Sequence, residues 1–353
     1  VSLVEDNFVL VVDTNNKAIR QIDLSNESVW TIPLPEMNYP VGIDFNPTDK
    51  KVYWTDLRGD VIKRSNLDGT SEEIVTSLHS GSYLFGLAID MVSGLMYFTE
   101  GGADIIAAVT LDGRQHFTLV TEDMDQPQEI ALDLERGLMF WTDNGQPPRI
   151  EKAAMDGTQR VVVITFDFDT SPTGLTIDNN GGRLYWCDSY THKIRSVLVD
   201  GSDMSIVVEN SGTTYYKIAF LADNLYFSAV SESYISKVSL SDTPRTSVQV
   251  GPAVFDSPTG ITAYRRRELT NDNCPQVHNE RKGEILSPGY PGYVNNVYCM
   301  ITIHMDNPDK KEHVIRLYVE DFDLQDKYDY LVIANNRFSS LQAHSSYSGT
   351  NST

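Results

Sequence analysis

Short apolar runs separated by turn residues recur along most of the chain, and an aromatic motif marks their period. An aromatic pair followed by Thr-Asp, or a close variant of it, begins at Tyr53, Tyr97, Phe140, Tyr185 and Tyr226, and Leu10 begins a sixth copy. The copies start 43, 44, 43, 45 and 41 residues apart. The runs are a few residues long and alternate between two faces, which predicts short β-strands rather than helices.

Two further signals keep the same period. Isoleucines recur once per unit, and Asp-Gly follows four of them as a hairpin turn, because glycine adopts a positive φ without steric cost. A glycine and an apolar residue mark another strand in four units, with Glu129-Ile130 and Lys217-Ile218 as variants. A four-stranded unit of about 40–45 residues is typical of a propeller blade, so residues 1–264 are predicted to form an all-β, six-bladed β-propeller. The isoleucines are Ile19, Ile62, Ile106, Ile150, Ile194 and Ile235, the turns begin at Asp68, Asp112, Asp156 and Asp200, and the glycines are Gly42, Gly86, Gly174 and Gly260.

The order of these signals predicts how the ring closes. The first unit contains the aromatic-type strand at Leu10 and the isoleucine strand, but it lacks the glycine-apolar strand. That strand occurs only at the far end, in residues 258–264. We therefore expect residues 258–264 to form the innermost strand of the blade built from residues 8–32, which leaves no long strand edge unpaired.

The repeat stops after residue 264, and a second module follows. Residues 265–273 are predicted to be a polar linker, and residues 274–353 contain alternating runs at 301–303, 314–319 and 328–333. Of the three cysteines, Cys274 and Cys299 lie close enough in the sequence for a local disulfide, whereas Cys187 stands alone. Two glycosylation sequons occur, at Asn26 and Asn351, and they would carry glycans only in a secretory protein.

Charge and hydropathy narrow the range of partners. The 353 residues carry 28 Lys and Arg against 49 Asp and Glu, a net charge of −21. This balance argues against nucleic acid, which needs concentrated basic residues, and it permits basic protein partners. No apolar run approaches the roughly 18 residues of a membrane span, so any membrane attachment is expected to lie outside this sequence.

The repeats resemble the YWTD propeller of the low-density lipoprotein receptor and its related proteins, most closely over residues 140–160 and 174–188. The tail resembles the first two-thirds of a CUB domain, a β-sandwich of secreted and cell-surface proteins, through Ser287-Pro-Gly-Tyr-Pro291 and its cysteine spacing. The resemblance implies an extracellular or secreted location and a tail that is truncated within the sandwich. It also places weak calcium ligands at Asp323 and Asp329, although the ion needs six to eight oxygens and the third carboxylate is missing. We expect no other cofactor.

The loops before the innermost strands and after the aromatic strands are expected to share one rim of the propeller. In the family that the chain resembles, this face binds protein ligands. Tyrosine supplies a large contact area at low entropic cost, so tyrosines among carboxylates favour a protein-binding surface. The candidate ligand-binding residues are Tyr39, Tyr83, Phe85, Tyr190, Tyr215, Tyr216, Tyr234, Asp56, Arg58, Glu100, Asp143 and Arg149.

Other motifs have structural explanations. The aromatic residues of the repeats are expected to fill the core between blades, and their Thr and Asp to bind backbone N–H groups at the strand end. Cys187 is expected to be an inert buried thiol. Four aspartates near the ends of the innermost strands would either cap turns or face the channel and bind calcium, and the first is the commoner role. They are Asp44, Asp90, Asp133 and Asp178.

Three functions are compatible with these features. The first is the extracellular ligand-binding module of a receptor related to the low-density lipoprotein receptor, with a Wnt co-receptor-like role as one form. The second is a secreted matrix scaffold of the nidogen type. The third is an enzyme of the lactonase or lyase type, but His79, His116 and His192 have no metal-ligand spacing, and no catalytic motif occurs, so we expect no catalysis.

Overall fold

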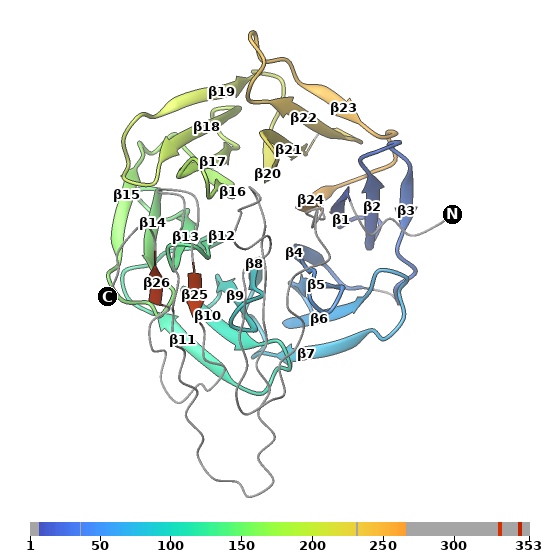
Figure 1. Ribbon diagram of the computed structural model, residues 1–353, viewed down its shortest axis with the longest axis vertical. Coiled ribbons are helices and arrows are strands. Elements are labelled where there is room, and N and C mark those ends of the chain that lie inside the picture. Colours follow the sequence, from blue (N-terminus) through green and yellow to red (C-terminus); the bar gives the residue numbers. More distant parts are fainter. Residues whose placement is uncertain (1–6, 36, 231, 266–330, 334–344, 348–353) are drawn as a thin grey trace, which may run out of the picture. The chain divides into compact units, whose positions relative to one another are not determined.

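The computed structural model describes residues 7–35, 37–230 and 232–265, together with the backbone of two short strands, 331–333 and 345–347. The described residues between 7 and 265 form six four-stranded antiparallel sheets arranged as blades around a central axis (Figure 1). The innermost strands contact one another in the closed order β24, β4, β8, β12, β16, β20 and back to β24. The predicted six-bladed propeller is confirmed.

The first three blades each contain four strands, which follow one another from the axis outward. Blade 1 consists of β24 (Pro258–Arg265), β1 (Asn7–Asp13), β2 (Ala18–Asp23) and β3 (Val29–Thr31). Blade 2 consists of β4 (Pro40–Asn46), β5 (Lys51–Asp56), β6 (Val61–Asn66) and β7 (Glu73–Ser77). Blade 3 consists of β8 (Leu84–Asp90), β9 (Leu95–Glu100), β10 (Ile105–Thr110) and β11 (His116–Val120).

The other three blades follow the same plan. Blade 4 consists of β12 (Pro127–Asp133), β13 (Leu138–Asp143), β14 (Arg149–Ala154) and β15 (Val161–Thr165). Blade 5 consists of β16 (Pro172–Asp178), β17 (Arg183–Asp188), β18 (Lys193–Leu198) and β19 (Ser205–Glu209). Blade 6 consists of β20 (Tyr215–Leu221), β21 (Asn224–Ala229), β22 (Ile235–Ser239) and β23 (Val248–Val250). In the tail, β25 (Leu331–Ile333) pairs antiparallel with β26 (Ser345–Tyr347).

Blade 1 is completed by a strand from the other end of the propeller sequence, as predicted. Phe8 pairs with Tyr264 and Val11 with Ile261, and the register shifts between Val12 and Asp13. Beyond the strand, the N–H of Thr14 donates to the carbonyl oxygen of Ser257 at 2.9 Å. Because these bonds join the two ends of the propeller, the ring is closed by main-chain pairing rather than by side-chain contact alone.

The hydrophobic core lies between the blades. Each of six buried clusters combines side chains of two consecutive blades, so that no blade has a core of its own. The aromatic residues of the repeated motif are central to these clusters, with Trp54, Trp141 and Trp186 all fully buried. Both faces of a blade's strands are therefore covered, which explains why the motif has apolar residues at consecutive positions. The predicted inter-blade role of the aromatics is confirmed.

The threonine of the motif connects neighbouring blades through hydrogen bonds. In blade 3, the Thr99 hydroxyl accepts from the N–H of Gly86 at 2.8 Å and donates to the carbonyl oxygen of Gln128 in blade 4 at 2.7 Å. In blade 5 this threonine is replaced by Cys187, and the hydroxyl of Thr173 donates instead to the carbonyl oxygen of Tyr216 at 2.9 Å. The polar contact with the next blade is thus kept where the motif changes.

The Asp-Gly turns also pack against the preceding blade. At Gly157, φ is +84°, and a Cβ added there would lie 2.3 Å from the carbonyl oxygen of Leu119. Glycine is therefore needed for two reasons, the left-handed backbone and the close approach to the outer strand of blade 3. Only the first reason is readable in the sequence.

Gly157→Ala should lower the free energy of unfolding by about 2–4 kcal/mol, the sum of left-handed strain and overpacking. Gly137→Ala is the matched control, because Gly137 has φ +64° and no atom within 4 Å of the added Cβ. It should cost only the strain, about 1–2 kcal/mol. Urea unfolding of both variants measures the difference, and equal losses would contradict the role of the inter-blade contact.

Candidate functional site

The loops that enter the innermost strands and those that leave the second strand of each blade lie at one end of the propeller. We call this end the rim. Hydrogen bonds join the two kinds of loop within each blade: Leu57 N–H donates to the carbonyl oxygen of Tyr39, Asn144 N–H to that of Gln126, and Ser189 N–H to that of Ser171. The rim loops of the described chain are 32–35 with 37–39, 78–83, 121–126, 166–171, 210–214 and 251–257, and also 14–17, 57–60, 101–104, 144–148, 189–192 and 230 with 232–234.

Aspartates at the strand ends build the rim rather than face a ligand. Asp56 is 3% exposed, and its carboxylate accepts from the N–H groups of Asn38 at 2.7 Å, Tyr39 at 2.9 Å and Gly59 at 3.0 Å. Asp143 accepts from Gly145 N–H at 3.2 Å and from Arg149 at 2.8 Å, and burial raises the pKa of Asp143. The predicted backbone role of the motif aspartates is confirmed. The candidates Asp56 and Asp143 are wrong as accessible ligand contacts, because their oxygens are buried in bonds to the chain.

Two more candidates are placed differently from the prediction. Tyr215 is 3% exposed and packs edge-on against Phe227 at 5.4 Å between ring centroids, so it belongs to the core between blades 5 and 6. Arg149 is held by carboxylates of Asp143 and Glu151, each at 2.8 Å. Its guanidinium is therefore held in ion pairs within the chain. Tyr215 is wrong as a ligand contact. Its backbone begins β20 next to the rim loop, but its ring is buried between the blades.

The remaining candidates reach the surface of the rim. Tyr83 and Tyr190 are 51% and 64% exposed. Tyr39 is half-buried and lies under the guanidinium of the exposed Arg58, 4.8 Å from the ring centroid. Tyr234 is half-buried, and its hydrogen bond to Glu232 raises its pKa. Phe85, Glu100 and Tyr216 are also half-buried. The rim thus presents aromatic side chains from several blades.

One exposed aromatic residue of the rim was not among the predicted ones. Phe168 lies in the loop that enters β16 and is 76% exposed, more than the other large apolar side chains that the structure describes. Its sequence neighbourhood, Phe166-Asp-Phe-Asp169, follows the apolar run of β15 with alternating apolar and acidic residues. The sequence therefore did not predict that Phe168 is exposed, because an apolar residue in an alternating pattern is expected to be buried.

An ion pair joins the innermost strands of two blades near the rim. Lys217 of blade 6 donates to a carboxylate oxygen of Glu129 in blade 4, and the two side chains are 4% and 14% exposed. Burial opposes the charge of Lys217, yet the carboxylate of Glu129 keeps its pKa above the usual value, so the ammonium group stays charged. The sequence marked these two residues only as variants of a glycine position.

Asp44 also differs from its predicted role. Asp90 and Asp133 cap turns, with Val92 N–H donating to Asp90 at 2.9 Å and Arg136 N–H donating to Asp133 at 3.0 Å. Asp44 lies two residues earlier in its strand, and Asn46 caps the equivalent turn. The Asp44 carboxylate instead accepts from Ile89 N–H of blade 3 at 2.8 Å and from the Thr262 hydroxyl of blade 1 at 3.0 Å. It therefore bridges three blades inside the ring.

The stability of the propeller should depend on pH through Asp44. Burial raises the pKa of this carboxyl from 3.8 to about 6. A group whose folded pKa is raised stabilises the fold fully below pH 3.8, and this contribution is lost as pH rises through 6. Asp44→Asn carries no charge, so relative to the wild type its free energy of unfolding should improve by about 1–2 kcal/mol between pH 4 and pH 7. Urea unfolding at several pH values measures this, and a pH-independent difference would contradict it.

Several predicted sites are not placed by the structure. Cys274, Cys299, Asn351, Asp323 and Asp329 lie outside the described residues. Within the described residues, Asn26 is exposed in the turn after β2, where its oxygen accepts from Ser28 N–H at 2.9 Å, and its glycosylation stays a prediction. Cys187 is a free, buried thiol whose pKa is raised by burial.

Two features are absent from the described residues. They contain no group of three or more His, Cys, Asp or Glu residues placed to hold a metal ion. No helix among them is long and apolar enough to cross a membrane.

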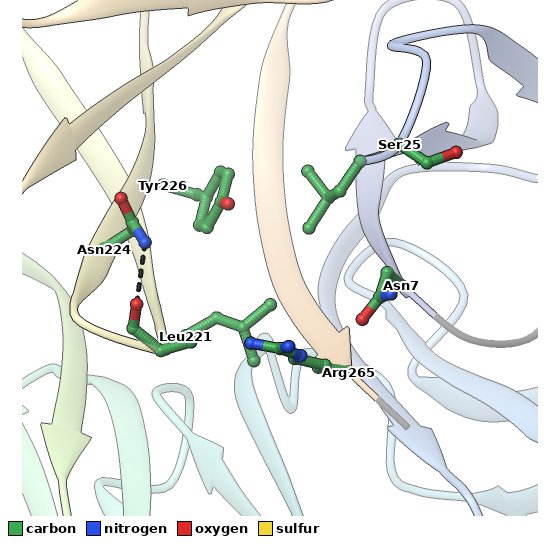
Figure 2. A pocket seen from close by; sticks show the side chains of 8 residues that line it. Asn7, Ser25, Leu221, Asn224, Tyr226 and Arg265 are labelled. Atoms are coloured by element: carbon green, nitrogen blue, oxygen red, sulfur yellow. Dashed lines mark hydrogen bonds between the residues drawn. The ribbon is translucent and has the colours of Figure 1, made fainter. Parts of the chain in front are cut away.

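A hollow of about 220 Å³ lies at the end of the propeller opposite the rim, where blades 6 and 1 meet (Figure 2). The apolar side chain of Leu221 and the polar side chains of Asn7 and Arg265 line it. Asn224 donates to a backbone carbonyl oxygen, that of Ala222, at 2.7 Å, so this group is satisfied within the chain. The hollow marks the seam at which the first and last strands of the ring meet.

Comparison with known proteins agrees with this architecture. The family "Low-density lipoprotein receptor repeat class B" matches residues 137–179, which include most of blade 4, and "CUB domain" matches residues 274–353. A crystal structure of a nidogen/laminin complex contains a chain with a TM-score of 0.65 and 24% identity, covering 73% of this chain and 98% of that one. A virginiamycin B lyase from Staphylococcus aureus has a TM-score of 0.53 and 18% identity, covering 69% of this chain and 80% of that one. These structures share the fold, and the two family matches define the chain as a YWTD-type six-bladed propeller followed by a CUB region.

Sequence relatives define the family. The chain is 32% identical over 189 residues to the human low-density lipoprotein receptor-related protein 5-like protein, covering 53% of this chain and 73% of that one. It is 33% identical over 212 residues to human low-density lipoprotein receptor-related protein 5, of which it spans 13%. The Drosophila melanogaster vitellogenin receptor Yl is 33% identical over 180 residues, or 9% of its length. The chain belongs to the family of low-density lipoprotein receptor-related proteins, and its domains are extracellular modules.

Proposed function

We propose that this propeller is the ligand-binding module of a cell-surface receptor of this family and that it binds a secreted protein on its rim. The observation that carries the proposal is the set of half-buried and exposed tyrosines that several blades bring to the same end of the ring. Partly buried aromatics supply much of the energy of protein interfaces. The named relatives are receptors, and by this proposal the chain binds rather than catalyses.

A matrix scaffold is the second candidate, and one observation favours it. The chain from the nidogen/laminin complex is covered over 98% of its length by this propeller. A scaffold would use the same rim to hold another matrix protein, without membrane attachment. Surface plasmon resonance of the immobilised chain against Wnt ligands and against laminin fragments separates the two candidates. Binding of Wnt ligands alone supports a co-receptor-like role, and binding of laminin alone supports the scaffold.

Substitution of the rim tyrosines tests where the ligand binds. Tyr39→Ala, Tyr83→Ala, Tyr216→Ala and Tyr234→Ala should include hot spots that each cost about 2 kcal/mol of binding free energy. Removal of a rim carboxylate, as in Glu100→Gln, should change mainly the association rate and its salt dependence. Calorimetry with the ligand found above measures both effects. If the four tyrosine variants bind with unchanged affinity, the ligand does not use this part of the rim.

A further inference from the structure

The two most exposed aromatic side chains of the described chain lie on rim loops of the same blade. Phe168 and Tyr190 are 76% and 64% exposed, and they belong to the loops that enter β16 and leave β17. These loops are joined by the hydrogen bond from Ser189 N–H to the carbonyl oxygen of Ser171 at 3.0 Å. We call Phe168 and Tyr190 the aromatic patch. Large apolar side chains exposed on neighbouring loops of a soluble domain mark an interaction surface.

The loop that carries Phe168 is anchored on both sides of it. Phe166 N–H donates to the carbonyl oxygen of Pro148 at 2.8 Å, and the Phe166 ring packs against Trp186 with 5.4 Å between ring centroids. At the other end, Ser171 N–H donates to the buried carboxylate of Asp188 at 3.2 Å. One residue on one side and two on the other therefore separate Phe168 from the anchored residues Phe166 and Ser171. Such a preorganised aromatic residue loses little entropy when a partner covers it.

The surroundings of the patch carry unpaired negative charge. Asp167 and Asp169 flank Phe168, and both are exposed. The rim loop that enters β12 of the neighbouring blade 4 exposes Glu122, Asp123 and Asp125, and none of these five carboxylates forms an ion pair within the described chain. Arg160 is bonded to the carboxylate of Glu151 at 2.7 Å and to the carbonyl oxygen of Asp123 at 2.9 Å, so it offsets only part of this negative charge.

The same carboxylates do not form a metal site, since the described residues contain no group of three potential ligands. Their charge is spread along two loops instead, which matches an extended cationic partner better than a single ion. A partner that brought more acid would meet repulsion from carboxylates that form no ion pair within the described chain.

We propose that the aromatic patch docks a cationic segment of a partner protein, in which lysines or arginines flank an apolar side chain. The apolar side chain covers Phe168 and Tyr190, and the basic residues lie over Asp167, Asp169 and the acidic loop of blade 4. This inference rests on the proposed function, which makes the rim the ligand-binding face. Beyond that function, it specifies which part of the rim binds the partner, the loops of blade 5, and the chemistry of the segment that binds there.

A fluorescent lysine peptide of about ten residues with a central tryptophan tests the proposal, with fluorescence anisotropy as the readout and the full 353-residue chain as receptor. Two variant peptides accompany it, one with serine in place of tryptophan and one with glutamates in place of the lysines. Asp167→Asn/Asp169→Asn should weaken binding of the first peptide about tenfold at low salt and reduce its salt dependence. Phe168→Ser should weaken it about tenfold as well, but it should leave the weaker serine peptide nearly unaffected.

The matched control removes the same charge elsewhere. Asp223 and Asp242 are exposed, form no ion pair within the described chain and lie on loops at the opposite end of the propeller. Asp223→Asn/Asp242→Asn, measured at the same salt concentration, should change the affinity less than about twofold. Equal losses in the two double variants would overturn the proposal, because net charge alone would then explain binding. Unchanged binding by Phe168→Ser would overturn it too.

A comparison of two variants distinguishes failure of the aromatic-patch proposal from failure of the proposed function. A secreted ligand whose affinity falls with Tyr39→Ala but not with Phe168→Ser leaves the rim as the binding face and overturns the aromatic patch. A ligand that loses about tenfold in affinity with Phe168→Ser supports the patch. Near-ultraviolet circular dichroism of each variant confirms that the propeller remains folded, and both substituted loops are on the surface.

Discussion

A chain that ends at Ser257 should fail to form the closed propeller, whereas a chain that ends at Arg265 should fold. The shorter chain lacks β24, which pairs with β1 over the whole length of that strand. It also loses the contacts of β24 with β4 and β20, so blade 1 is left without its inner strand and two inter-blade interfaces are opened. Each blade depends on its neighbours for a core, so the loss should exceed about 5 kcal/mol, which is the scale of a domain's total stability.

The comparison is made by circular dichroism during thermal unfolding and by size-exclusion chromatography. The longer chain should show one cooperative transition and a compact elution volume, and the shorter chain a broad transition with aggregation through exposed strand edges. Both chains lack the tail, so the difference between them reports β24 alone. A cooperative transition at the same temperature in both would show that blade 1 is stable without its inner strand.

The sequence predicts the propeller because its signals repeat. A single aromatic run such as 53–56 could be a strand of many folds, but three signals with one period leave one architecture, and the missing strand of the first unit identifies the closure. The threonine bridges and the buried aspartates follow from the same repetition. These features are local or periodic, and a periodic pattern can be recognised in the sequence without knowledge of the three-dimensional arrangement.

The rim is harder to predict, because exposure depends on contacts between loops of different blades. Tyr215 and Tyr216 are adjacent in the sequence, yet one ring lies in the core and the other at the rim. The nearness of Asp44 to a strand end predicts a turn cap, but its offset from Gly42 is two residues, not the four that separate Asp90 from Gly86. The number of residues from the glycine to the aspartate therefore distinguishes Asp44 from the aspartates that cap turns. The exposure of Phe168 has no such signal.

The ion pair between Glu129 and Lys217 could not be predicted from the sequence either. The repeat shows only that both residues stand at the position where four blades have glycine. Four blades have glycine at this point because a Cβ would lie 2.1–2.9 Å from backbone or side-chain atoms of its surroundings, as at Gly86 and Gly174. In blades 4 and 6 this position holds Glu129 and Lys217, and blade 5 lies between them. Two long side chains of opposite charge therefore meet across the axis, 88 residues apart in the sequence.

The largest effect of a single substitution is expected from breaking this ion pair. Lys217→Met leaves the carboxylate of Glu129 mostly buried and uncompensated, which should cost about 3–5 kcal/mol of the free energy of unfolding. Glu129→Gln leaves the ammonium group of Lys217 in the same position and should cost a similar amount, about 3 kcal/mol. Urea unfolding at neutral pH, with the slope of the transition held as a check on two-state behaviour, measures both.

The double variant Lys217→Met/Glu129→Gln decides between ion pairing and simple packing. With both charges removed, no desolvated charge remains, so the loss should fall below about 1 kcal/mol, far less than the sum of the single losses. Lys193→Met is the matched control, because Lys193 pairs with Glu209 at 3.2 Å on the surface, where the partner is 55% exposed. That substitution should cost under about 1 kcal/mol. Additive losses at positions 129 and 217 would mean that the two side chains stabilise the innermost strands by their volume, each against its own blade, and not by their charge.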